Sequence, residues 1–298
     1  MKTVIKHLLL TAALLCAASP ALAQNGPPPS PYAPLQDHPS CTLDELKAAS
    51  SAYVEAQKTG DIAKLPLDPK AHFLENMKDV EKGAGLWNTA LPIAHDMSFH
   101  DPKRCKSFTE IVVTGGGKPY VIGTRLYLHQ GKVIRVDSIV TRPGDWLFNA
   151  NAYDKYTKAE DWSELFKYQK TEPKEMMRGA NAYLDGFADK FTDIPWGTPC
   201  ARLEGGAYTN AKGDPHASCE IGLPPGVLYI VNRDYLVDEE KGVINVFCRF
   251  GGSTGGPDVH SFRFIDGKIR AVHTLSALPG PQADDKGGII RGGGINGS

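Results

Sequence analysis

The sequence predicts an α+β protein made of two tandem cone-shaped domains, each with helices packed on a curved antiparallel sheet. One observation behind this prediction is an internal repeat, in which three features return in one order about 130 residues later. The other is that each copy begins with an amphipathic helical segment and continues with strand segments, which is the α+β order. The repeated features are the helical tyrosines Tyr53 and Tyr183, the acidic residues Glu75 and Glu204, and the hairpin segments 128–133 and 264–269.

The first 40 residues are expected to precede the folded domains. Lys2 and Lys6 stand ahead of an apolar run, and Ala21-Leu22-Ala23 supplies small residues for cleavage, so residues 1–23 are predicted to be a signal peptide. The run is too short to span a bilayer. We therefore expect a periplasmic or secreted protein, in which residues 24–40 form a proline-rich extended leader.

The first domain is predicted at residues 41–144. Thr42 and Glu45 have the spacing of a helix capping box, and apolar residues follow at helical spacing up to Gly60. Gln130-Gly131 is a two-residue turn that suits a twisted antiparallel hairpin. The predicted strands of this domain are 108–114, 120–129 and 133–141.

The second domain is predicted at residues 173–278. Pro173 begins a helix whose apolar stripe extends to Phe187 and Phe191. Asp266-Gly267 is a second hairpin turn of the kind found in the first domain. The predicted strands here are 227–237, 244–250, 260–265 and 269–276.

Two further segments complete the predicted organisation. Residues 145–172 form a connector that is rich in aromatic side chains, which we expect to pack the two domains against each other. The alternative is that these aromatics form a lid over a binding pit. Residues 279–298, rich in glycine, are predicted to be a disordered tail.

Removal of the signal peptide leaves five cysteines, in a compartment where disulfides persist. An odd number leaves at least one thiol unpaired. Cys200 and Cys219 flank a loop that a bridge would staple, and Cys41 and Cys105 could tie the first helix to its sheet, but the sequence does not decide the connectivity. Cys248 lies in a strand pattern, where a buried inert thiol is favoured over a nucleophile.

The segment 262–269, with the sequence FRFIDGKI, resembles the last hairpin of the nuclear-transport-factor-2-like superfamily. That superfamily includes SnoaL-like polyketide cyclases, ketosteroid isomerases and scytalone dehydratases. Through the segments 145–150, 199–206 and 258–274, the chain further resembles secreted fungal and bacterial proteins with two such domains. The resemblance implies the cone fold but no particular reaction, because this scaffold hosts both enzymes and pure binders.

In ketosteroid-isomerase-like members, the pit of the cone holds a helix tyrosine as donor, a carboxylate base and a polar strand residue. The resemblance carries these roles to Tyr183, Glu204 and His260 of the second copy, with Tyr183 as a merely packed helix residue being the alternative. A threonine cannot take up a proton near neutral pH, whereas a histidine titrates there, so the second copy is predicted to hold the active pit. The matching positions of the first copy are Tyr53, Glu75 and Thr124.

His273 aligns with Asp137. If its strand directs it into the pit, it would divide acid and base roles with Glu204. Because side chains alternate between the two faces of a strand, His273 could equally lie on the outer face of the sheet. His260 could instead be satisfied at the interface between the copies. Arg202 either holds an oxyanion or pairs with Glu204. Burial in an apolar cone is expected to raise the pKa of Glu204 toward a range useful for a general base. The predicted catalytic residues are Glu204, His260, His273 and Tyr183, and the predicted substrate-binding residues are Arg202, Tyr53, Glu75 and Asp137.

The composition argues against several kinds of partner. A net charge of −1 gives no electrostatic reason to expect nucleic acid or anionic lipid. The sequence contains no dinucleotide fingerprint, serine elbow or cysteine–histidine motif. Its histidine and acidic groupings lack zinc-site spacing, so we expect neither a cofactor nor a metal. These groupings are His72 with Glu75, and His95-Asp96 with His100-Asp101.

The predicted function is that of a cofactor-independent lyase or isomerase. Dehydration, a double-bond shift or retro-aldol release of a small aldehyde needs only a placed base, a donor and a dry pocket. The expected substrate is a hydrophobic aromatic small molecule, such as a lignin-derived or polyketide-like compound. The alternative is a non-catalytic secreted binding protein. The resemblance implies domains that commonly pair through their sheets, so in either case the duplication would place that pair within one chain and predicts a monomer.

Overall fold

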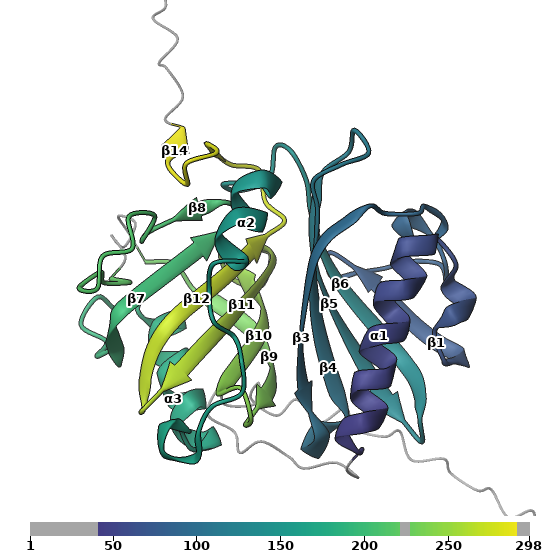
Figure 1. Ribbon diagram of the computed structural model, residues 1–298, viewed down its shortest axis with the longest axis horizontal. Coiled ribbons are helices and arrows are strands. Elements are labelled where there is room, and N and C mark those ends of the chain that lie inside the picture. The colour runs from purple at the N-terminus through teal and green to yellow at the C-terminus, as the bar shows by residue number, and fades with distance from the viewer. Residues whose placement is uncertain (1–40, 221–226, 291–298) are drawn as a thin grey trace, which may run out of the picture. The chain divides into compact units, whose positions relative to one another are not determined.

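The computed structural model describes residues 41–220 and 227–290, so the predicted signal peptide and leader lie outside the described residues. The described residues contain two six-stranded sheets, and both sheets belong to one compact body. The strand order is β2-β1-β6-β5-β4-β3 in the first sheet and β8-β7-β12-β11-β10-β9 in the second. The second order repeats the first with every strand number raised by six, which confirms two tandem α+β units of one topology (Figure 1).

The first unit begins with one long helix and continues with six strands. Its elements are α1 (Leu43–Thr59), β1 (Leu67–Glu75), β2 (Lys78–Asp79), β3 (Ile93–Asp101), β4 (Lys106–Val113), β5 (Tyr120–His129) and β6 (Lys132–Thr141). Short 3₁₀ turns connect them at Ile62–Lys64, Gly85–Asn88 and Pro102–Arg104.

The second unit follows a connector that contains the helix α2 (Ala150–Thr157) and a 3₁₀ turn at Lys167–Gln169. Its elements are α3 (Pro173–Asp185), β7 (Trp196–Glu204), β8 (Ala207–Tyr208), β9 (Ile230–Asp238), β10 (Val243–Phe250), β11 (Gly256–Ile265) and β12 (Lys268–Ser276). Gln130-Gly131 and Asp266-Gly267 form the two tight hairpin turns that the sequence predicts, and all four residues have positive φ.

The sheets are chiefly antiparallel, as predicted, but each also contains one parallel pair of strands. β1 pairs parallel with β6, and β7 pairs parallel with β12. The strands predicted from the sequence do not include β1, β3 or β7. β1 and β7 are hard to predict because each contains a proline, Pro69 or Pro199, a residue that strands usually exclude.

Two boundary predictions also need correction. Helix α3 ends at Asp185, so Phe187 and Phe191 lie beyond it, and Phe191 is fully exposed. The predicted disordered tail is ordered up to residue 290, where β13 (Gln282–Ala283) pairs with β14 (Ile289–Ile290). The backbone of the connector donates hydrogen bonds to Leu278 and Pro281, which ties this segment to the fold. Residues 291–298 lie outside the described part of the chain.

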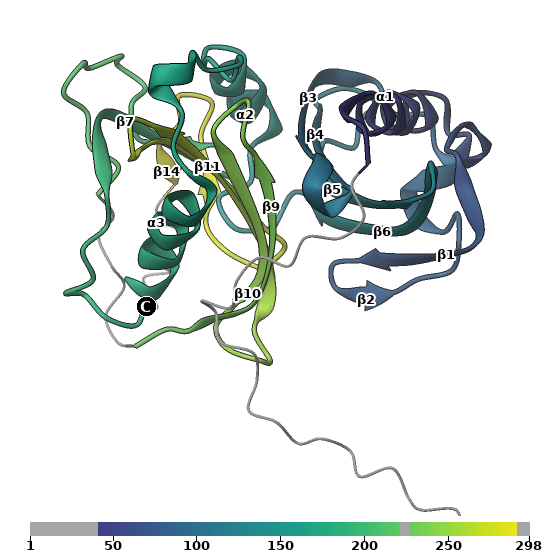
Figure 2. The same ribbon diagram turned by 90° about the horizontal axis from the view of Figure 1, so that it is seen from below.

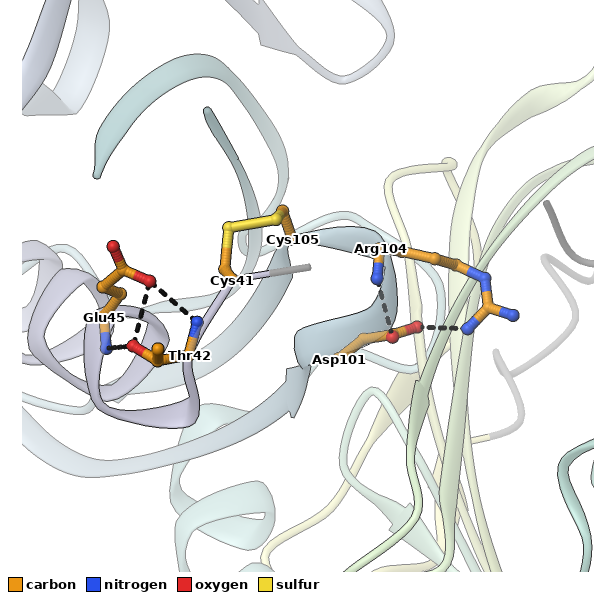
Figure 3. The surroundings of a disulfide bond; sticks show 6 residues. All are labelled: Cys41, Thr42, Glu45, Asp101, Arg104 and Cys105. Carbon is orange, nitrogen blue, oxygen red and sulfur yellow. Dashed lines mark hydrogen bonds and ion pairs between the residues drawn. A yellow bond between two sulfur atoms is a disulfide. The ribbon is translucent and has the colours of Figure 1, made fainter. Parts of the chain in front are cut away.

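The start of α1 is fixed by the predicted capping box and by a disulfide (Figure 3). The side chain of Thr42 accepts a hydrogen bond from the backbone of Glu45, whose carboxylate accepts one in return from the Thr42 backbone. Cys41 is bonded to Cys105, which follows the 3₁₀ turn after β3. A second disulfide joins Cys200 to Cys219. The structure therefore has both bridges that the sequence suggested, and Cys248 is a buried free thiol.

Each sheet buries both faces. Helix α1 lies against one face of the first sheet and α3 against one face of the second (Figure 2). The opposite faces share a third core, in which Phe108 of β4 meets Phe247 of β10 and Tyr153 of α2 packs in as well. Four connector aromatics, Phe148, Tyr153, Tyr156 and Trp162, belong to this core, whereas Phe166 and Tyr168 are exposed. None of the helices in the described part of the chain has the length and apolar character of a membrane span.

Candidate functional site

Strand register places the second-copy candidates on one face of the sheet. Thr274 of β12 lies directly opposite Glu204 of β7 on one side and His260 of β11 on the other. Directly opposed residues of neighbouring strands point to the same face. Glu204 and His260 therefore share a face, and it is the face that α3 covers, because the core beneath α3 contains Phe262 and Val272 of the same strands.

Tyr183 of α3 lies over this face. Its ring packs edge-on against Phe262, with centroids 5.0 Å apart, and against His260, at 5.5 Å. Burial raises the pKa of Tyr183, so the phenol is neutral and able to donate a hydrogen bond. The charges of Arg202 and Glu204 also act on this hydroxyl, which forms no hydrogen bond with any described residue.

Arg202 and Glu204 form an ion pair at the edge of the same face. Nη2 of Arg202 donates to Oε2 of Glu204 over 2.6 Å. The other carboxylate oxygen accepts a hydrogen bond from Nε1 of Trp146 in the connector, over 2.7 Å. Nε and Nη1 of Arg202 are buried and have no acceptor among the described residues. Burial opposes the charge of Arg202, but Tyr183 and Glu204 outweigh it and raise the pKa.

Both ring nitrogens of His260 are engaged by buried neighbours. Nε2 lies 2.8 Å from Oδ2 of Asp258, and Nδ1 lies 3.0 Å from the hydroxyl of Thr274. The other oxygen of Asp258 accepts a hydrogen bond from Ser276 over 2.9 Å. His260 is thus part of a closed hydrogen-bond network within its own unit rather than an imidazole with a free nitrogen.

His273 lies on the opposite face from His260, because it is directly paired with Ser261 and neighbours Thr274 along β12. This settles the alternative that strand parity left open, and His273 cannot share a pit with Glu204. It lies instead between the two sheets. Nε2 is 2.6 Å from Glu160, and Nδ1 is 3.2 Å from Glu110 of β4. Burial would lower the pKa of His273, but the two carboxylates outweigh burial and raise it to about 10.

Asp137 is the first-copy counterpart of His273, and it too lies between the sheets. Arg135 donates two hydrogen bonds to its carboxylate, over 2.8 and 2.6 Å, and Tyr127 donates a third over 3.2 Å. Tyr127 also donates to Asp234 of β9, over 2.6 Å. Asp137 is therefore separated from Tyr53 and Glu75 by the thickness of the sheet.

The first copy contains the same ladder with different side chains. Glu75, Ser138 and Thr124 are directly opposed across β1, β6 and β5. The hydroxyl of Tyr53 lies 2.7 Å from that of Thr124, so this tyrosine is satisfied. Phe73 occupies the position of Arg202, since Phe73 pairs with Val136 as Arg202 pairs with Val272.

Three cavities have linings that consist of described residues, and none of the three includes Tyr183, Glu204 or His260. One of about 380 Å³ lies between the sheets and includes the predicted residue Asp137. Its other lining residues are Leu74, Met77, Tyr127, Arg135, Ser138, Ile139, Asn232, Asp234, Phe247 and Arg249. A second, of about 420 Å³, includes Glu160 and Trp162, next to His273.

Sequence reasoning missed two residues that complete the second-copy arrangement, and it did not place a third. Trp146, which binds Glu204, was assigned only to the connector, because nothing local indicates a contact 58 residues away. Asp258 was missed although it stands two positions before His260 in a strand, a spacing that places both on one face. Cys248 was identified as a buried strand residue, but its position opposite Asp258 depends on register.

The comparisons with known proteins give a fold-level picture. Residues 169–276, which span α3 and β7 to β12, match a family described as "Domain of unknown function (DUF8021)". No curated protein matches the chain. The chain is similar to a solved NTF-2 like protein of unknown function from Burkholderia xenovorans LB400, with 16% identity, a TM-score of 0.28, and coverage of 41% of this chain and 96% of that chain.

A second solved structure is a DUF4783 family protein from Bacteroides fragilis YCH46. It has 19% identity and a TM-score of 0.23, and the match covers 30% of this chain and 96% of that chain. Each solved structure thus corresponds in length to a part of this chain. At these TM-scores neither similarity bears on the function.

Proposed function

We propose that the second unit binds a hydrophobic, aromatic small molecule and acts on it as a cofactor-independent lyase or isomerase. The observation that carries this proposal is the pair of buried N–H groups of Arg202 without an acceptor among the described residues. Buried donors are almost always satisfied in folded proteins. A ligand oxygen that accepts from Arg202 supplies the missing partner.

The groups around Arg202 fit proton transfer next to a carbonyl. Arg202 and the neutral hydroxyl of Tyr183 donate to the ligand oxygen, and Glu204, paired with Arg202, accepts a proton from the neighbouring carbon. In that step the C–H bond breaks, its electron pair moves to the oxygen as an enolate, and the proton resides on the carboxylate. Return of the proton to another carbon is an isomerisation, whereas its departure with a hydroxyl group as water is a dehydration.

The aromatic side chains above the sheet support an aromatic ligand. Tyr183 makes edge-on contacts with Trp196 and Phe187 as well as with Phe262, at centroid distances of 5.0 to 5.7 Å. Aromatic rings prefer such edge-on and offset partners. A ligand ring that enters from the Arg202 side would extend this cluster.

A second candidate function is that of a non-catalytic binding protein. It is favoured because the groups that would transfer protons already have hydrogen-bond partners. Glu204 accepts hydrogen bonds from both Arg202 and Trp146. Each of the two carboxylate oxygens is thus already occupied by one donor. His260, with both nitrogens engaged, is not a competing base.

We also propose that the protein is exported and monomeric. Two disulfides fit an oxidising compartment. The faces through which two separate domains could pair are already covered within one chain, where Arg125 of β5 donates to Asp234 of β9 over 2.8 Å. Size-exclusion chromatography with light scattering should therefore give the mass of a single chain.

Solvent deuterium exchange separates the two functions. The protein is incubated in D₂O with aryl ketones that carry an acidic α C–H, such as 2-tetralone and phenylacetone, and deuterium incorporation and binding are followed by NMR. The lyase or isomerase accelerates exchange, and Glu204→Gln slows that exchange by about 100-fold or more while binding persists. Glu75→Gln, the matched first-copy variant, should leave the exchange rate unchanged.

Each outcome has one meaning in this experiment. Saturable binding without exchange, lost in Arg202→Met, identifies the binding protein. Exchange that is equally fast in Glu204→Gln contradicts the assignment of the base. Binding that survives both Arg202→Met and Tyr183→Phe overturns the proposed site.

A further inference from the structure

Three side chains with metal-binding atoms converge inside the second unit. Sγ of Cys248, a carboxylate oxygen of Asp258 and a ring nitrogen of His260 all lie within 4.8 Å of one another, and all three residues are buried. Sγ lies 4.0 Å from Oδ2 of Asp258, and Nε2 of His260 lies 2.8 Å from the same oxygen. The register explains the convergence, because Cys248 and Asp258 are directly opposed and His260 follows on the same face of β11.

The atoms of these residues that face away from the cluster are held by neighbouring hydroxyls. Thr274 engages Nδ1 of His260 over 3.0 Å, and Ser276 donates to Oδ1 of Asp258 over 2.9 Å. Metal-binding histidines and carboxylates are typically oriented in this way, through a hydrogen bond at the atom that does not touch the metal. Nε2, Oδ2 and Sγ are thereby left directed at one another.

Comparison with the first unit shows that the fold does not require polar residues here. The positions of Cys248, Asp258 and His260 correspond in the first sheet to Ile111, Ile122 and Thr124, since Ile111 opposes Ile122 as Cys248 opposes Asp258. Both isoleucines are buried core residues. The second unit thus places a thiol and a carboxyl where its twin has aliphatic side chains, and buried polar groups of this kind cost free energy unless they are paired or bind a metal.

The electrostatics of the cluster also fit a divalent cation. Asp258 is fully buried, and its one ion-pair partner among the described residues is His260. A thiolate, a carboxylate and a neutral imidazole carry two negative charges, which one divalent cation neutralises. Four of the five described cysteines are in disulfides, so Cys248 is the remaining thiol that a metal could use.

We propose that Cys248, Asp258 and His260 form a zinc-binding site. Zn²⁺ accepts sulfur, nitrogen and carboxylate oxygen as ligands, and it commonly has three protein ligands and one open position when it serves a reaction. The cation takes the place of the proton shared by Nε2 of His260 and Oδ2 of Asp258. This site is distinct from the Arg202–Glu204 pair of the proposed function and does not depend on it, although Tyr183 packs against His260 and adjoins both.

The test uses the full chain with its disulfides intact. Because the cluster is buried, the protein is unfolded in denaturant with a chelator and refolded either with Zn²⁺ or without metal. Mass spectrometry of the metal content should then give about one zinc per chain after refolding with Zn²⁺. Refolding with Co²⁺ should give the thiolate-to-cobalt charge-transfer absorption, which reports Cys248 directly.

Variants distinguish coordination from loss of structure. Cys248→Ser should abolish the cobalt charge-transfer band, and Thr274→Val, which removes only the hydroxyl that orients His260, should weaken zinc binding by about 10- to 100-fold. Glu204→Gln is the matched control, because it disables the base of the proposed function and should leave the metal content unchanged. Refolded wild-type protein without stoichiometric zinc, or Cys248→Ser with full metal content, would overturn the site. Neither result would affect the proposed function, which is read from deuterium exchange.

Discussion

The two units of this protein share one backbone plan and use the face beneath their helix in opposite ways. In the first unit, Phe73 and Trp87 pack around Tyr53, with ring centroids 5.7 Å apart in both the Tyr53–Trp87 and Phe73–Trp87 pairs, and Thr124 satisfies the tyrosine hydroxyl. In the second, Arg202 stands at the Phe73 position, and its Nε and Nη1 have no acceptor among the described residues. One copy is thus a closed core and the other holds unused donors.

This difference shows how duplication can separate stability from function. In the first copy Thr124 satisfies the hydroxyl of the helix tyrosine, which is the arrangement that folding alone favours. The second retains buried donors and a thiol–carboxyl–imidazole cluster, which folding alone disfavours. Local features that oppose stability are expected at functional sites, so the second unit is where ligands should bind.

The largest expected effect comes from the disulfides of the two units. Cys41–Cys105 closes a loop with a sequence separation of 64, and Cys200–Cys219 one of 19. In the chain-entropy account, removal of these bridges costs about 4 and about 3 kcal/mol of unfolding free energy, respectively. Urea unfolding of the two double serine variants measures this. A larger loss for the Cys200/Cys219 variant would mean that the bridge chiefly holds its loop in place rather than restricting the unfolded chain.

The next effect is at the contact between the units, where His273 and His100 should respond to pH in opposite directions. The folded-state pKa of His273 is raised to about 10, so its stabilisation is complete below the unfolded value near 6.5 and is lost as pH rises toward 10. The folded pKa of His100 is lowered to about 4, chiefly by burial, so its stabilisation is complete above about 6.5 and is lost as pH falls toward 4.

Urea midpoints from pH 4 to pH 10 for wild type, His273→Gln and His100→Gln test this pair. The alkaline loss for wild type should be about 2 to 4 kcal/mol and should be much smaller in His273→Gln. The loss of stability as pH falls from about 6.5 toward 4 should be smaller in His100→Gln than in wild type. If both variants reproduce the wild-type profile, other groups control the pH dependence.

The sequence predicts the architecture better than it predicts the site, for physical reasons. Capping at Thr42 and the turns at Gln130 and Asp266 are local signals that a few residues encode, and the structure has all three. The face on which His273 lies depends on the register of β12 against both neighbours, which no local pattern specifies. The contact between Trp146 and Glu204 also needs the tertiary fold.

A smaller effect concerns the Arg202–Glu204 ion pair. Both side chains are mostly buried, at 14% and 20% exposure, so a double-mutant cycle with Arg202→Met and Glu204→Gln should give a coupling of about 1 to 2 kcal/mol. The corresponding cycle in the first unit, Phe73→Met with Glu75→Gln, joins residues that form no ion pair and should give less than about 0.5 kcal/mol. If the coupling between Arg202 and Glu204 is also less than about 0.5 kcal/mol, the two side chains contribute to stability independently.

The smallest expected effect on stability is also the most direct comparison of the two pits. Tyr53→Phe removes a hydroxyl that is hydrogen-bonded to Thr124 and should cost about 1 kcal/mol in urea unfolding. Tyr183→Phe removes a hydroxyl without a partner among the described residues, so its cost should be near zero. Ligand binding should show the reverse order, with a loss in Tyr183→Phe and none in Tyr53→Phe. If removal of the Tyr183 hydroxyl leaves stability unchanged but weakens binding, that hydroxyl is oriented for the ligand. If Tyr183→Phe instead loses as much stability as Tyr53→Phe, both pits are closed cores.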